Sequence, residues 1–152
     1  MTRINSDIKP QHLIDKHLFS EYREMVRIPS LILKNLDKNL NRKFPSDFRM
    51  GNGHVLYFYD KIRYLHNRFL NIKEQLIDRG YENLSIGDDN FIIIKNKAPK
   101  LYKGISKGEL KYNSSIVIER IIERCEDKDL YLNKSKIEYK EYLNIIDIYL
   151  KH

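Results

Sequence analysis

The sequence predicts an all-α, mainly helical protein: a single compact domain, residues 1–152, of three to four helices with long irregular connections. Apolar residues recur three and four positions apart in several segments, which is the spacing of a helix buried on one face. The length allows one domain with a core but is short for two. The 41% hydrophobic and 32% charged residues are typical of a folded chain. No repeat or linker divides it.

The first predicted helix covers residues 10–28, because its apolar residues recur at spacings of four, four and three. Pro10 suits its first position. Pro29 is predicted to break or kink it, with residues 30–36 continuing beyond the kink and a polar connector over 39–49. The apolar positions of this helix are Ile14, Leu18, Tyr22 and Met25.

The second helix is expected to be the central buried one. It follows Gly51-Asn52-Gly53-His54 and stops at Gly80, which suits a left-handed C-terminal residue. Gly51-Asn52-Gly53 is not a nucleotide-binding loop, because Leu56 stands where the fingerprint needs glycine and no strand precedes it. The apolar positions are Phe58, Ile62, Leu65, Phe69, Ile72 and Leu76.

The second half of the chain is less regular. Residues 91–94, Phe-Ile-Ile-Ile, fit a short strand or an extended loop over the core. A third helix is predicted from about Ser114 to Cys125. A fourth is predicted to start at Ser135, where Ser135 and Glu138 have capping-box spacing.

The net charge of the chain narrows the range of its possible binding partners. The net charge of +7 and the pI of about 9.3 favour a polyanion, although a lysine-rich solvated surface has the same balance. No apolar run could cross a bilayer and no signal peptide is evident, so we expect a cytoplasmic protein. Cys125, the single cysteine, excludes an internal disulfide and is assigned no role.

The polar side of the first helix carries a charged set. With Glu24 as origin and about 100° per residue, Ser20, Arg27, Lys16 and Arg23 lie from about −40° to −100° and His17 near +20°. The apolar positions lie from about +80° to +160°, facing the central helix. The cations could bind consecutive phosphates and stabilise the Glu24 carboxylate. The alternative is a solvated face with ordinary helical ion pairs.

The N-terminus offers a nucleophile. If Met1 is removed, as a small second residue permits, Thr2 carries an α-amine with a pKa of about 8, against about 10.4 for lysine. Such an amine is partly neutral at physiological pH and can attack a sugar carbon to form an imine. Arg3 beside it could hold a phosphate. The alternative is an ordinary frayed terminus.

Three stretches resemble the pyrimidine-dimer DNA glycosylases of the phage endonuclease V type. They are MTRIN at residues 1–5, HLIDKHLFSEYRE at 12–24, and GHVLYFYDK at 53–61 continuing to about Gly80. The match covers about the first 80 residues in the family's order.

The resemblance implies a DNA repair enzyme with N-glycosylase and abasic-site lyase activity on UV-induced cyclobutane pyrimidine dimers. It implies that the Thr2 amine attacks C1′ and that Glu24 stabilises the cationic sugar, with β-elimination following. No cofactor or metal is implied, and the five histidines show no zinc-ligand pairing. The implied DNA contacts are Arg3, His17, Tyr22, Arg23 and Arg27, together with Arg120 and Arg124, and the helix face adds Lys16.

The resemblance also implies base flipping, double-stranded damaged DNA as partner, a monomer, and a phage or viral origin. The chain departs from the family in its tail. It has no tryptophan, and Leu130-Tyr131-Leu132-Asn133-Lys134 stands where the family has an aromatic, basic segment. Tyr131 could stack on a base, but a tyrosine among leucines is more often core.

Three alternatives stay open. Without the aromatic tail the enzyme could prefer abasic sites or another lesion. The scaffold could bind DNA without catalysis. A basic helical protein that binds RNA or another partner would leave the combination of Thr2, Glu24 and Arg27 unexplained.

Overall fold

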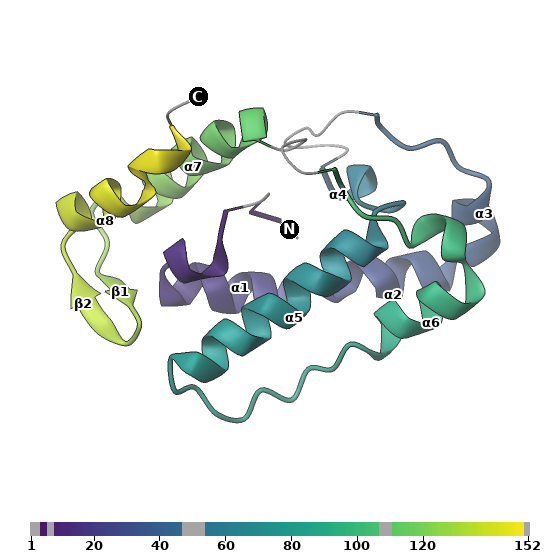
Figure 1. Cartoon of the computed structure of the whole chain (residues 1–152), viewed down its shortest axis with the longest axis horizontal. Helices are drawn as coiled ribbons and strands as arrows, with labels where there is room; N and C mark the ends of the chain where they lie inside the picture. Colours follow the sequence, from purple (N-terminus) through teal and green to yellow (C-terminus); the bar gives the residue numbers. More distant parts are fainter. Residues whose placement is uncertain (1–3, 6–7, 47–53, 107–110, 151–152) are drawn as a thin grey trace.

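Figure 1 shows the computed structural model, which describes residues 4–5, 8–46, 54–106 and 111–150. The described chain is mainly helical, with more helices than the three to four expected and one small two-stranded sheet that was not expected. None of the helices in these residues is long and apolar enough to cross a membrane. In chain order the elements are η1 (Pro10–His12), α1 (Asp15–Met25), α2 (Arg27–Lys34), α3 (Leu36–Leu40), α4 (His54–Tyr57), α5 (Ile62–Asp78), α6 (Asp89–Lys97), η2 (Pro99–Leu101), α7 (Lys111–Cys125), β1 (Leu130–Leu132), β2 (Ser135–Ile137), α8 (Tyr139–Ile146) and η3 (Asp147–Tyr149).

Helices α1 and α5 form the centre of the molecule and lie side by side (Figure 1). The predicted apolar faces meet here: Leu18, Met25 and Leu65 are fully buried. The Tyr22 ring stacks on Phe69, with centroids 5.5 Å apart. The prediction that the first helix docks on a central buried helix is confirmed.

The first predicted helix is divided differently from the expectation. Residues 10–12 form a separate 3₁₀ turn, and the break between α1 and α2 falls at Val26 rather than at Pro29. Pro29 occupies the third position of α2, in the first helical turn, where its missing N–H has no intrahelical partner to lose. The chain therefore bends one turn before the proline.

The central helix starts later than predicted and ends where predicted. A short α4 precedes it, and α5 begins at Ile62. Gly80 has φ +88°, the left-handed conformation expected of a residue after a helix.

Residues 91–94 are helical, so the expectation of a strand or loop was wrong. Phe91 and Ile94 are three apart and fully buried, whereas Ile92 is 41% exposed. The segment therefore presents one helical face to the core. Asp89 in its first turn and Lys95 and Lys97 in its last turn suit the helix dipole.

The fourth helix was also placed wrongly. Ser135 pairs with Leu132 in an antiparallel hairpin, and α8 begins only at Tyr139. Asn133 and Lys134 both have positive φ, at 54° and 66°, which forms the two-residue turn of a tight hairpin. The third helix was predicted correctly to end at Cys125, although it begins at Lys111.

Candidate active site

We call residues 1–12 the N-terminal arm; the structure describes residues 4–5 and 8–12 of it, which contact α1, α4 and α5. Thr2 and Arg3 lie outside the described residues, but Ile4 and Asn5 are placed and buried. The Ile4 N–H donates to Nε2 of His54, at 2.9 Å. Asn5 donates through its side-chain amide to Oε1 of Glu21, at 2.7 Å. The arm is therefore fixed to α4 at Ile4 and to α1 at Asn5, one and two residues after Arg3.

Glu21 and Arg68 form a buried ion pair beneath this arm. Their side chains are 0% and 6% exposed. Arg68 donates to the Glu21 carboxylate through Nε and through Nη2, the latter at 3.1 Å, and its Nη1 donates to the Ile8 carbonyl, at 2.9 Å. A buried charge is tolerated when it is paired and hydrogen-bonded, and both conditions hold here.

Sequence reasoning missed this pair. The signal was present, because Arg68 lies three residues after Leu65 and four before Ile72, on the edge of the apolar stripe of α5. Glu21 falls near +60° on the wheel of α1, between the polar set and the apolar stripe. When two helices pack together and each has a charged residue at the edge of its apolar face, the two charged residues can pair in the interface.

The predicted charged face of α1 is present on the surface. Lys16, Arg23 and Arg27 are exposed, and Glu24 is half-buried one helical turn beyond Glu21. Arg23 places its guanidinium 5.9 Å from the centre of the Phe19 ring. The face can present three cations around one carboxylate, while the opposite face of α1 packs on α5.

A comparison with protein families matches residues 1–85 to the model described as pyrimidine dimer DNA glycosylase. The match spans more than half of the 152 residues. The chain belongs to the pyrimidine dimer DNA glycosylase family. Its substrate is DNA, and its activity is that of a DNA-repair glycosylase. The matched residues include the N-terminal arm, α1 and all of α5; the elements from α6 onward lie outside them.

Two other predicted contact residues of this glycosylase lie deeper than α1's cations. His17 is 7% exposed and Tyr22 is 3% exposed. The Tyr22 hydroxyl accepts the Ile86 N–H, at 2.9 Å, and fastens the segment after α5. In this structure Tyr22 is a core residue, and its contact with DNA stays a prediction, as does that of His17.

The two predicted contact arginines of α7 lie on the surface. Arg120 and Arg124 are exposed, and Arg120 lies 3.8 Å from Glu123. Burial raises the pKa of the Cys125 thiol to about 11, against the opposing positive charges of Arg124 and Lys16. The Cys125 thiol is free and buried.

The hairpin of the glycosylase is fastened to α1 through Asp15. Its carboxylate accepts hydrogen bonds from Arg79, Tyr81 and the backbone N–H groups of Asn133 and Lys134, at 2.5–2.9 Å. Burial alone would raise the pKa of Asp15, but these hydrogen bonds together lower it. The carboxylate thus holds the hairpin turn in its ionised form.

Tyr131 is on the open side of this hairpin. It is 48% exposed, so the expectation that it is a core residue was wrong. Its cross-strand partner is Lys136. An aromatic ring and a lysine stand next to each other on the surface, although the family's aromatic tail is absent.

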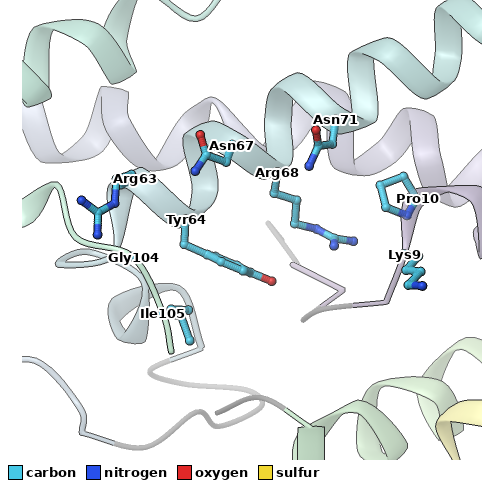
Figure 2. A pocket seen from close by; sticks show the side chains of 9 residues that line it. All are labelled: Lys9, Pro10, Arg63, Tyr64, Asn67, Arg68, Asn71, Gly104 and Ile105. Atoms are coloured by element: carbon cyan, nitrogen blue, oxygen red, sulfur yellow. The ribbon is translucent and has the colours of Figure 1, made fainter. Parts of the chain in front are cut away.

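A groove of about 440 Å³ lies between α5, Lys9 and Pro10 of the N-terminal arm, and Gly104 and Ile105 (Figure 2). Figure 2 shows Arg68 extending from α5 toward Pro10, with Asn67 and Asn71 beside it. No lining residue belongs to α1. Glu24 and the cations of α1 are therefore not among the residues that line the groove. Elsewhere in residues 4–5, 8–46, 54–106 and 111–150, no group of three His, Cys, Asp or Glu is arranged to hold a metal.

Proposed function

We propose that this family member is a DNA N-glycosylase with abasic-site lyase activity on cyclobutane pyrimidine dimers, using the Thr2 amine as nucleophile and Glu24 as its carboxylate partner. The observation that carries the proposal is the attachment of the N-terminal arm to α1, through Asn5 and Glu21, one helical turn from Glu24.

Chain length supports the pairing of Thr2 with Glu24. Three residues separate the Asn5 nitrogen from the Thr2 amine, a reach of about 10 Å when extended. Glu24 is three residues beyond Glu21, about 4.5 Å along the helix axis. Because Asn5 is hydrogen-bonded to Glu21, the chain between Asn5 and Thr2 is long enough for the amine to reach the Glu24 carboxylate.

The chemistry needs only these two groups and the sugar. The neutral amine attacks C1′, the C1′–N bond to the base breaks, and the resulting imine acidifies the C2′ proton. Glu24 stabilises the positive charge on the sugar and assists proton transfer. Loss of the C2′ proton then expels the 3′ phosphate, which cleaves the strand. The amine acts without desolvation because its pKa is about 8.

The proposed DNA contacts are the exposed cations of α1 and α7, together with Arg3. Lys16, Arg23 and Arg27 on α1 would bind phosphates of the damaged strand, and Arg120 and Arg124 would extend the contact from α7. Arg3 would hold the flanking phosphate, with His17 and Tyr22 lining the site. We propose that a base is extruded from the duplex, since unstacking costs less at damaged DNA.

Borohydride trapping tests the proposal. The protein is incubated with duplexes that contain either a pyrimidine dimer or an abasic site, and the reduced imine is detected as a covalent complex. Trapping on both duplexes is expected. Mass spectrometry should find the DNA on Thr2, and a variant that retains Met1 should not be trapped.

A second candidate function is that of an abasic-site lyase, which would cleave DNA strands at abasic sites without specificity for pyrimidine dimers. It is favoured by one observation: the elements after residue 85 lie outside the family match, and the hairpin there has one exposed tyrosine in place of an aromatic tail. Trapping on abasic DNA alone would support it. Trapping on neither duplex, with DNA binding intact, would indicate a non-catalytic DNA-binding protein.

A further inference from the structure

The backbone of the N-terminal arm is held by side chains from distant elements. Arg68 and Arg79 donate to carbonyls of Ile8, Pro10 and Gln11. Backbone groups outside helices and sheets need such partners when water is excluded. The position of the arm is therefore decided by tertiary contacts.

Two more side chains, from the opposite end of the chain, also hold the arm. The Tyr149 hydroxyl accepts the Lys9 N–H, at 3.0 Å, and lies 2.5 Å from Nδ1 of His12. The His12 and Tyr149 rings meet edge to face, with centroids 5.5 Å apart. The Tyr142 hydroxyl donates to the His12 carbonyl, at 2.8 Å.

The hydrogen bonds have a consistent direction. If Tyr149 accepts from Lys9, its own proton can go to Nδ1 of His12, which satisfies both groups. Tyr142 is fully buried between α8 and the arm, whereas Tyr149 is half-buried. Helix α8 and η3 also contact α7, so Tyr142 and Tyr149, which we call the clamp, are attached to the body of the protein.

We propose that Tyr149 and Tyr142, from the C-terminal α8–η3 segment, are positioning residues. They hold the N-terminal arm at Lys9 and His12 for catalysis. The proposal rests on the proposed function, in which the arm carries the reactive amine. The clamp lies outside residues 1–85, so it is a contribution of this chain's C-terminal part. Imine formation requires the amine to be held at attack distance, and a small displacement is costly.

The test compares Tyr149→Phe and Tyr142→Phe with Tyr139→Phe in the full-length protein. Tyr139 is the first residue of α8 and has no hydrogen bond to the described part of the arm, so it is a matched control. Single-turnover imine trapping is measured at saturating abasic duplex, at a temperature where circular dichroism shows each variant folded. DNA affinity is measured separately by fluorescence anisotropy.

Tyr149→Phe is expected to slow trapping by about 10- to 100-fold at saturation, because a displaced nucleophile loses its alignment. Its DNA affinity should stay within about twofold of wild type, because the cations of α1 and α7 are unchanged. Tyr142→Phe should act in the same direction and Tyr139→Phe should match wild type. A purely structural role would leave the saturated rate of folded protein unchanged.

The clamp is refuted if wild type is trapped on abasic DNA and Tyr149→Phe is trapped at the same rate. It is also refuted if Tyr139→Phe is slowed as much as Tyr149→Phe. Failure of wild type to be trapped on any damaged duplex would instead refute the proposed imine chemistry. The two failures are therefore distinguishable.

Discussion

Glu21 and Arg68 bring α1, α5 and the N-terminal arm to one point. A single carboxylate, 0% exposed, accepts hydrogen bonds from Arg68 and from Asn5, while Arg68 also holds the Ile8 carbonyl. The ion pair therefore holds the N-terminal arm against α1 and α5, at Asn5 and at Ile8. Glu21 lies one helical turn before Glu24 on α1.

Breaking this pair from one side should be costly. Glu21→Gln leaves the Arg68 guanidinium buried without its counter-charge, so the free energy of unfolding should fall by about 3–5 kcal/mol. Urea denaturation at pH 7 measures it. The double variant Glu21→Gln/Arg68→Met removes both charges and should be more stable than Glu21→Gln alone. A double variant that loses the sum of the two single losses would show that the residues do not interact.

Asp15 should make the free energy of unfolding depend on pH in the acidic range. Its folded pKa lies below the ordinary 3.8, because hydrogen bonds from Tyr81, Lys134, Arg79 and Asn133 outweigh the effect of burial. The unfolded chain then takes up the proton first as the pH falls, so the stabilisation is present above about pH 5 and is lost as the pH falls through the folded pKa. Unfolding free energies from pH 6 to pH 2.5 measure it.

Asp15→Asn is the matched variant for this pH series. It should be less stable at pH 6, by about 1–3 kcal/mol, because an amide offers fewer acceptors to four donors. The gap to wild type should narrow toward low pH. A constant gap would show that Asp15 does not titrate as described.

Glu24→Gln should separate chemistry from binding. Glu24 is half-buried at the charged face, so the substitution should leave the fold intact. The single-turnover rate on abasic DNA should fall by about 10²- to 10⁴-fold, the usual contribution of a group that assists proton transfer. Glu119→Gln, an exposed carboxylate on α7, is the control. Equal rates for Glu24→Gln and wild type would remove Glu24 from the mechanism.

The salt dependence of the DNA affinity should report how many phosphates the protein contacts. Arg23→Gln, Arg27→Gln, Arg120→Gln and Arg124→Gln should each reduce the slope of log affinity against log salt by about 0.9, because each removes one neutralised phosphate. Anisotropy titrations from 50 to 200 mM NaCl on an undamaged duplex measure it. Lys97→Gln, an exposed lysine at the end of α6, should leave the slope unchanged. An unchanged slope for an arginine variant would exclude that residue as a phosphate contact.

Periodicity was enough for the parts of the fold that depend on one buried face. The docking of α1 on α5, the stop at Gly80 and the end of α7 at Cys125 were predicted correctly. Residues 91–94 were not, because a four-residue apolar run fits a strand or a helix equally until its neighbours decide which side chains are buried. The hairpin was missed because Asn133 and Lys134 adopt positive φ with their N–H groups on Asp15, more than a hundred residues away.

The sequence by itself determined the family, the basic charge and the helical face that carries Lys16, Arg23, Glu24 and Arg27, because residue types and helical spacing are local properties. Tertiary structure alone decided that Glu21 pairs with Arg68, that Asp15 holds the hairpin, and that Tyr149 grips the base of the arm. Each of these contacts joins residues far apart in the chain, and a buried charge or hydroxyl finds its partner only when packing brings the two together.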